Sequence, residues 1–285
     1  MTETGIFREW IGRTETTTQV AERWPILGLC ALLDKPEAPS PGEPIPPAAH
    51  WTYFSPTVPQ SQIGADGHPE RKGFLPPVVQ PRRMWAASDI TFSGEIHIGD
   101  VVTKTARIVD ISEKEGKTGA LIFVMVDNRY QVDDREVLSE LQTLVYRDHP
   151  GPGESPPPAK AAPANPAWSH RIDPDPVLLF RYSAVTFNGH RIHYDEPYTT
   201  REEGYLGIIV QGQLTATLLL DQFHTRFPGC PIRSFNFRAV KPLFSGHPFF
   251  LEGAEKSDGS YALWARDEEG ALSMAAELSY ERHHR

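Results

Sequence analysis

A short polar stretch in the second half of the chain, residues 182–195, holds side chains that can move a proton. Within eight residues it places an amide, Asn188, two imidazoles, His190 and His193, and a carboxylate, Asp195. A near-neutral imidazole takes and returns a proton at pH 7, whereas an amide forms hydrogen bonds but does not titrate. This pattern favours acid–base chemistry by an imidazole, with Asn188 able to orient a bound molecule beside it.

An apolar segment close behind this stretch predicts a buried helix over residues 212–227. Its apolar side chains point in almost every direction around a helix, which indicates that protein covers it on several sides. Pro228 and Gly229 would end it. Gly212 would then present a free backbone N–H at the positive end of the helix dipole, where it could stabilise a developing oxyanion.

The two halves of the chain repeat the same order of segments, which predicts an internal duplication. A Pro-, Gly- and Ala-rich linker at 150–168 separates residues 1–149 from residues 169–285. Turn signals divide each half into strand-length segments, at 84–98, 101–110, 120–127 and 136–146, and at 232–245, 249–255, 261–266 and 271–280. A helix enclosed by an antiparallel sheet, occurring twice, is the plan of a double hot-dog, an α+β fold.

The first half departs from this plan. Residues 16–33 predict a helix interrupted near Pro25, and a Pro-rich segment from Pro36 to Pro76 follows where the first half would need its own central helix. We expect that helix to be shortened or lost. The Pro-rich segment contains Trp51, Tyr53 and Phe54, so it is either part of a binding surface or an ordinary long loop.

Composition limits the possible partners. The chain has 285 residues and a net charge of -9, which argues against general nucleic-acid binding but is compatible with a local basic pocket. Signal-peptide and membrane-spanning patterns are absent, which predicts a soluble, cytoplasmic protein. The chain also lacks the glycine fingerprints of nicotinamide, flavin and nucleotide sites, and its two cysteines, Cys30 and Cys230, fit no metal or disulfide pattern.

The polar stretch resembles the signature of the MaoC-like hydratase-2 family. Tyr182-Ser-Ala-Val-Thr186 matches its opening, His193 stands at its catalytic histidine, and Asn188 stands where that family has a catalytic aspartate. Gln211-Gly212 falls where the family has His-Gly before its central helix. The resemblance implies a catalytic set of His193, Asn188 and Gly212, with the proton transfer assigned to His193.

Further motifs are similar to those of a narrower group, the hydroxyacyl-thioester dehydratases of type 2, over most of the chain. They are Asn188-x-His-x-Ile-His-Tyr-Asp195, His50-Trp51, Asp66-Gly-His-Pro69, Pro81-Arg-Arg-Met-Trp85 and Gln142-x-x-x-Tyr146-Arg147. The resemblance implies reversible hydration of an enoyl thioester carried by CoA or acyl-carrier protein, such as a mesaconyl or itaconyl ester. CoA would be part of the substrate, no other cofactor is expected, and a homodimer is plausible.

The same resemblance suggests residues that contact the substrate: His190, Arg191, Gln211, Trp51, Arg82, Arg83 and Arg238. The arginines of the pair at 82–83 and Arg238 would meet CoA phosphates, or else are solvated charges on strand edges. We hypothesise that Arg191, two residues from His193, meets a substrate carboxylate.

Three other interpretations of these residues stay open. A hot-dog thioesterase would need a carboxylate on the central helix, and Asp221 is the acid within it. A module that only binds thioesters would not need His193 for binding. His190-x-x-His193-x-Asp195 resembles a metal-ligand set, but it lacks cysteine and an i, i+4 helical pair, so no metal is predicted.

Overall fold

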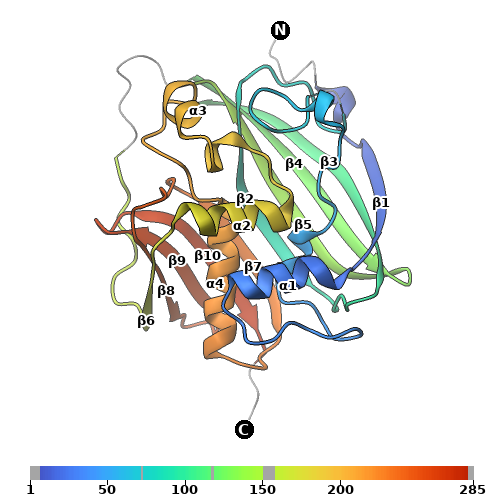
Figure 1. Ribbon diagram of the computed structural model, residues 1–285, viewed down its shortest axis with the longest axis vertical. Helices are drawn as coiled ribbons and strands as arrows, with labels where there is room; N and C mark the ends of the chain where they lie inside the picture. The colour runs from blue at the N-terminus through green and yellow to red at the C-terminus, as the bar shows by residue number, and fades with distance from the viewer. Residues whose placement is uncertain (1–6, 72, 117–118, 150–157, 282–285) are drawn as a thin grey trace.

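A computed structural model describes residues 7–71, 73–116, 119–149 and 158–281 of the chain. Its described strands form one sheet in the order β1-β3-β4-β5-β2-β7-β10-β9-β8-β6, with antiparallel neighbours throughout (Figure 1). The strands are β1 Thr14–Val20, β2 Arg82–Phe92, β3 Val101–Gly116, β4 Gly119–Val132, β5 Arg135–Arg147, β6 Trp168–Ile172, β7 Ile232–Ala239, β8 Phe249–Glu255, β9 Tyr261–Asp267 and β10 Leu272–Tyr280.

The predicted duplication is visible in this strand order. Read outward from the β2–β7 contact, the first half runs β2-β5-β4-β3-β1 and the second runs β7-β10-β9-β8-β6, with each half in the same chain order. The two halves join where β2 and β7 pair from Ala87 opposite Arg238 to Thr91 opposite Ser234. The expected double hot-dog is confirmed.

The helices lie on one side of the sheet in Figure 1. They are α1 Arg23–Leu32, α2 Pro176–Thr186, α3 Glu196–Arg201 and α4 Gly212–Arg226, and short 3-10 turns accompany them at η2 Arg8–Trp10, η3 Ala49–Thr52, η4 Gln60–Gln62 and η5 Arg191–His193. α1 follows β1 and α2 follows β6, so these two helices occupy equivalent places and pack against each other.

α4 is the central helix predicted from the sequence, and the structure confirms it to within one residue at its end. It buries Leu214, Thr215, Ala216, Thr217, Leu218, Leu219, Leu220 and Phe223 against strands of the second half. The first half has no equivalent among its described residues, because the segment between α1 and β2 contains only η3 and η4. The expected loss of that helix is therefore confirmed.

Two local predictions were wrong or incomplete. Residues 14–20 form strand β1 rather than the start of a helix, because this threonine-rich run pairs with β3 through its backbone, and β-branched side chains favour strands. Helix α2 was not predicted, although Asp175 caps it by accepting from the N–H of Leu178 and Pro176 is its first residue. Of the expected linker, residues 150–157 lie outside the described residues.

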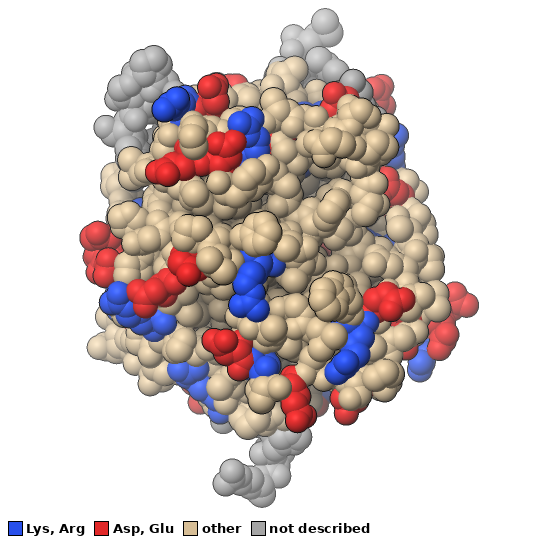
Figure 2. All heavy atoms as spheres, in the orientation of Figure 1, with Lys and Arg blue, Asp and Glu red and all other residues tan. Residues whose placement is uncertain are grey.

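The described end of the linker is bound to the sheet rather than free. Lys160 and Ala162 form backbone hydrogen bonds with Leu272 and Gly270, and Ala167 donates to Gly253. The boundaries at 149 and 169 stay predictions. No helix of the described residues combines the length and apolar character that crossing a membrane needs. Figure 2 shows charged side chains of both signs scattered over one face, which agrees with the absence of a strongly basic surface there.

Candidate active site

His193 is held as a neutral base inside the second half. Its side chain is 8% exposed, and Nδ1 lies 2.8 Å from the carbonyl oxygen of Ile209. Because a carbonyl only accepts, Nδ1 carries the proton and Nε2 has the lone pair. Burial lowers the pKa of His193 to about 4, against the opposing hydrogen bond to Ile209. At pH 7 the imidazole is therefore uncharged and able to take a proton through Nε2.

Local capping interactions set the position of His193. It ends the short turn η5, and Asp195 then caps α3 by accepting from the N–H of Tyr198 at 3.1 Å. The other oxygen of Asp195 accepts two hydrogen bonds from Arg191, at 2.9 and 2.7 Å. Asp195 therefore orients the backbone around the imidazole, and its carboxylate is already used by Arg191.

The start of α4 lies close to the backbone carbonyl that binds this imidazole. Gly212 is the first residue of α4 and comes three residues after Ile209, so the Cα atoms of Ile209 and Gly212 are at most about 11 Å apart. Gly212 is exposed, and a Cβ built on it would meet no atom closer than the Met274 Cε at 4.0 Å. Its N–H has no hydrogen-bond partner among the described residues, so it is available to an oxyanion.

Gln211 holds the start of α4 in place by hydrogen bonds to α2. Its side chain is 1% exposed, and Nε2 donates to the Leu179 carbonyl at 2.9 Å and to the Ser183 hydroxyl at 3.0 Å, both on α2. Its Oε1 is buried and has no partner among the described residues. Gln211 therefore joins α4 to α2 and leaves one acceptor unused beside Gly212.

Asn188 was expected to orient a bound molecule beside His193, and its carbonyl is used within its own loop. Its Oδ1 accepts from the backbone N–H of His190 at 3.1 Å, which leaves the Nδ2 amide group as the free end of the side chain. Asn188 therefore shapes the loop that holds His190 and His193. A direct catalytic role for Asn188 stays a prediction.

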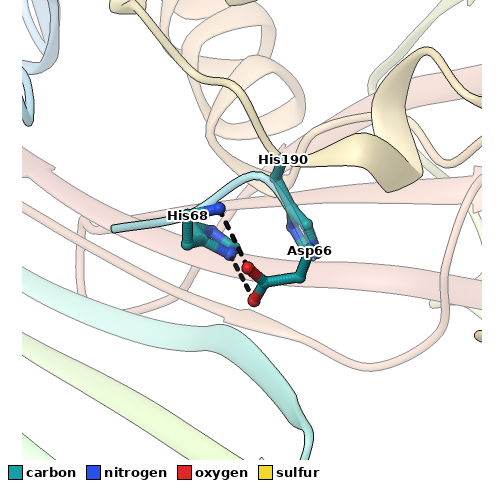
Figure 3. A group of neighbouring side chains, drawn as sticks. All are labelled: Asp66, His68 and His190. Atoms are coloured by element: carbon teal, nitrogen blue, oxygen red, sulfur yellow. Dashed lines mark hydrogen bonds and ion pairs between the residues drawn. The ribbon is translucent and has the colours of Figure 1, made fainter. Parts of the chain in front are cut away.

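A loop from the first half completes the cluster. His68 Nδ1 lies 3.1 Å from Asp66 Oδ2, and the backbone N–H of His68 donates to Asp66 Oδ1 at 3.0 Å (Figure 3). The His68 ring lies 4.0 Å from the His190 ring, centre to centre, and the His190 ring lies 5.4 Å from the His193 ring. Three imidazoles from both halves thus form a row that ends at the candidate base.

The two segments of this row meet backbone to backbone. Arg191 donates from its backbone N–H to the Asp66 carbonyl and from its guanidinium to the Ala65 carbonyl, each at 2.9 Å. Gly67 has a φ of +87°, and a Cβ there would stand 1.9 Å from the Gly189 carbonyl oxygen. A glycine at position 67 is therefore required both by its backbone angle and by the close approach of the two loops.

The electrostatics of the row favour neutral imidazoles beside one carboxylate. Burial lowers the pKa of His68, and burial together with the neighbouring imidazoles holds the pKa of His190 far below its usual value. Burial alone would raise the pKa of Asp66, but the hydrogen bonds that it accepts from the side chain and the backbone N–H of His68 outweigh burial and lower it. Asp66 is therefore ionised at neutral pH.

Asp66, His68 and His190 each offer a ligand atom within 4.8 Å of the others, a spacing that a divalent cation could bridge. This group was not recognised from the sequence as a set. The motif that contains Asp66 and His68 was noted for its family resemblance, but 122 residues separate His68 from His190 and no local pattern links them. Asp195 is not a member of the group.

Of the other residues predicted to contact the substrate, Arg83 lies near the row of imidazoles, whereas Arg82 and Trp51 are bound to acidic residues. Arg83 is half-buried at the start of β2, near the row, since its charge contributes to lowering the pKa of both His68 and His190. Arg82 instead pairs with Glu203 at 3.2 Å and stacks on Tyr205. Trp51 is buried in the core, where its indole N–H donates to Glu140.

Two arginines are placed differently from the expectation. Arg238 is exposed on β7, next to the buried Phe237, so it points away from the covered face of the sheet. The guanidinium of Arg191 is occupied by Asp195 and the Ala65 carbonyl, and it stacks on Tyr198. These contacts argue against the hypothesis that Arg191 binds a substrate carboxylate.

Comparisons with known proteins show the family to which this chain belongs. The family model for hydroxyacyl-thioester dehydratase type 2 matches residues 48–245. A mesaconyl-C(4)-CoA hydratase of Chloroflexus aurantiacus is 42% identical, over 94% of this chain and 95% of its own length. A mitochondrial hydroxyacyl-thioester dehydratase type 2 of Schizosaccharomyces pombe is 25% identical, over 71% of this chain and 75% of its own.

Solved structures show the same fold. HtdX of Mycobacterium tuberculosis superposes with a TM-score of 0.68 at 21% identity, covering 94% of this chain and all of that one. A second M. tuberculosis protein, described as a double hotdog fold, gives a TM-score of 0.59 over 95% of this chain and 96% of its own, at 12% identity. The matches in sequence and fold place this chain in the hydroxyacyl-thioester dehydratase type 2 family, as a hydro-lyase of acyl thioesters.

Proposed function

We propose that this chain catalyses the reversible addition of water to the double bond of an enoyl-CoA, with mesaconyl-C(4)-CoA as the substrate type. One observation carries the proposal: a buried neutral His193, with Nε2 unprotonated, is bound to the carbonyl of Ile209, three residues before the free N–H of Gly212 at the start of α4. The 42% identity to the Chloroflexus mesaconyl-C(4)-CoA hydratase supports the choice of acyl group. CoA enters as part of the substrate, and the scheme uses no further cofactor.

In the hydration direction, Nε2 of His193 takes a proton from water as the water oxygen bonds to Cβ. The electron pair of the double bond moves toward Cα and onto the thioester oxygen, which becomes enolate-like. The N–H of Gly212 and the dipole of α4 stabilise that negative charge. The imidazolium then returns its proton to Cα, so one water is added and the thioester stays intact.

The fixed proton on Nδ1 is essential to this scheme. The Ile209 carbonyl holds the ring in one orientation and stabilises the imidazolium that forms transiently, because Nδ1–H keeps its acceptor throughout. Asn188 cannot titrate and so cannot share the proton transfer. His193 is therefore proposed to perform both proton transfers.

A thioesterase is less compatible with the arrangement. Asp221, the acid on α4, is paired with Lys35 at 2.6 Å. It lies nine residues after Gly212, which corresponds to about 13 Å along a helix. A carboxylate at that distance, already neutralised by a lysine, cannot attack a thioester held at the helix start.

The proposal is tested with a pair of substitutions at Gly212. Proline is tolerated at the first position of a helix and removes only the N–H, and Gln211 has the extended backbone, φ -60° and ψ 132°, that a residue before proline prefers. We expect Gly212→Pro to lower kcat by about 10² to 10³ while the protein stays folded. Gly212→Ala, which keeps the N–H, is the matched control.

The assay follows both possible reactions at once. Hydration removes the enoyl absorbance without releasing thiol, whereas thioester hydrolysis releases free CoA that a thiol reagent detects. Turnover of mesaconyl-C(4)-CoA or crotonyl-CoA that persists in His193→Ala, or free thiol release by the native protein, would contradict the proposal. Equal activity of the two Gly212 variants would remove the N–H from the mechanism.

A further inference from the structure

Arg83 is a half-buried guanidinium that no carboxylate of the described residues pairs with. Nearby arginines are all engaged. Arg71 donates to the backbone carbonyls of Val78, Gln80 and Pro81, Arg82 pairs with Glu203, and Arg191 pairs with Asp195. An unpaired, partly desolvated cation is costly to a fold, so a position that keeps one is a candidate for binding an anion.

A second unused donor lies beside Arg83. Tyr146 on β5 is directly opposite Arg83 on β2 in the strand register, so both side chains lie on the same face of the sheet. Tyr146 is 0% exposed and the guanidinium of Arg83 acts directly on its hydroxyl, but that hydroxyl has no hydrogen bond of normal geometry, and so no acceptor, among the described residues. A buried phenol without an acceptor is destabilising unless a bound molecule supplies one.

This pair of donors lies at the far end of the row of imidazoles. His193 is next to Ile209 and the start of α4, His190 comes next, and His68 stacks on His190. The charge of Arg83 acts on His68 and His190, and those of Asp66 and Arg71 act on Tyr146. The path from the helix start therefore leads past His193 and His190 to Arg83.

We propose that Arg83 and Tyr146 form a subsite for the free carboxylate of a dicarboxylic acyl thioester. This proposal rests on the hydration of an enoyl thioester at His193. With the thioester oxygen at Gly212, the acyl chain extends toward His193, and a carboxylate on Cβ extends further in the same direction. Guanidinium and phenol are complementary to that group, since Arg binds a carboxylate through two parallel hydrogen bonds and the phenol adds a third.

The alternative ligand for Arg83 is a phosphate of CoA. The phosphates, however, are attached on the sulfur side of the thioester, whereas the charge of Arg83 acts on His190 and His68, the two imidazoles that follow His193 in the row. Local charge also favours a single carboxylate. Among the charged groups that act on the Tyr146 hydroxyl, the two cations Arg71 and Arg83 outnumber the single anion Asp66, which favours a bound monoanion there.

Two substrates, one with and one without a free carboxylate, separate these possibilities. Crotonyl-CoA is an enoyl thioester like mesaconyl-C(4)-CoA but has no carboxylate on Cβ. We expect Arg83→Gln to lower kcat/KM for mesaconyl-C(4)-CoA by about 100-fold or more, because the carboxylate loses a bidentate charged partner, and to change it for crotonyl-CoA by less than about threefold. Arg83→Lys, which keeps the charge but not the planar fork, should give an intermediate loss on mesaconyl-C(4)-CoA only.

Tyr146→Phe keeps the ring in the core and removes only the hydroxyl. It should lower kcat/KM for mesaconyl-C(4)-CoA by about tenfold and leave crotonyl-CoA unchanged, which tests the subsite even if Arg83→Gln folds poorly. Arg107→Gln, at an exposed arginine on β3, is the matched control and should alter neither substrate.

The outcomes distinguish a failure of the carboxylate subsite from a failure of the proposed hydratase function. Equal losses on both substrates in Arg83→Gln would assign Arg83 to CoA and overturn the carboxylate subsite. A native protein that hydrates crotonyl-CoA but not mesaconyl-C(4)-CoA would also overturn the subsite while leaving the hydratase function intact. A native protein that hydrates neither, with His193 in place, would contradict the hydratase function itself.

Discussion

Replacing His193 with asparagine should remove a pH-dependent component of the stability of this protein. The native imidazole is buried and its pKa is lowered from 6.5 to about 4, so it stays neutral in the folded state down to that pH. In the unfolded chain the same group protonates at its ordinary pKa. Between these two pH values the unfolded state binds more protons than the folded state, and the folded state therefore loses stability as the pH falls.

The magnitude follows from the two pKa values. At pH 7.5 the group is neutral in both states and contributes almost no difference. At pH 5 the unfolded form is mostly protonated while the folded form is not, which lowers the free energy of unfolding by about 2 kcal/mol, rising to about 3 kcal/mol at pH 4. Asparagine cannot protonate, yet its amide N–H can still donate to the Ile209 carbonyl that His193 uses.

Urea unfolding at pH 7.5 and pH 5.0, followed by tryptophan fluorescence, measures this difference directly. The native free energy of unfolding should fall by about 2 kcal/mol more than that of His193→Asn between the two pH values. Titrating groups that do not interact with His193 contribute equally to both proteins and cancel. A difference between the two proteins that stays constant with pH would refute the buried neutral imidazole, and with it the assignment of the base.

The neutral state of the His193 imidazole also predicts how kcat/KM depends on pH. Because only the neutral imidazole can accept the proton of water, kcat/KM should decline on the acid side as His193 protonates, with a midpoint near pH 4 if the fold survives there. His193→Asn should lose about 10² to 10⁴ in kcat at every pH. An acid limb that persists unchanged in the residual activity of the variant would assign the titration to another group.

Three further substitutions or treatments test the surroundings of the site. Gly67→Ala should lower kcat by about tenfold or more because its Cβ would collide with the Gly189 carbonyl and separate the two loops; unchanged kinetics in a folded variant would contradict that contact. Glu140→Gln should lower the free energy of unfolding by about 3 kcal/mol in urea at pH 7, because Glu140 is a buried acceptor for Trp51 and lies 3.3 Å from His50. Treatment with EDTA should leave kcat unchanged; a loss that zinc restores would show that the Asp66 cluster binds a catalytic metal.

The second half of the fold was well predicted because its signals are local. The apolar segment that forms α4 and the alternating strands β8 and β9 match their predicted ranges closely, since periodicity reports which face of an element is covered. Helix α2 was not predicted, although Asp175 and Pro176 carry the signal for its start, because residues 182–186 were interpreted as part of a chemical motif. Residues 16–20 were assigned to a helix because their pairing with β3, which decides their conformation, is not a local property.

Only those site residues that lie near one another in the sequence could be predicted as a group. His193 and Gly212 belong to one continuous stretch, and the structure brings them close through the Ile209 carbonyl. Asp66 and His68 reach the site from a loop in the other half, and Arg83 does so from β2, by contacts that join distant parts of the chain. Sequence motifs indicated that these residues belong to motifs of the family, but only the packing of the two loops shows which of them lie near the imidazole of His193.

The loss of one helix explains why a duplicated chain has one site of this kind. In each half, the place before the second strand of the repeat would hold a central helix whose N-terminus could stabilise an oxyanion. In the second half that helix is α4, whereas among the described residues of the first half the place is taken by the loop that carries Asp66 and His68. That loop crosses to the surviving site and contacts its catalytic loop through Gly67 and Gly189. The first half therefore has no second helix terminus of this kind, and its loop instead supplies side chains to the site at the start of α4. Neither half is therefore expected to be active alone.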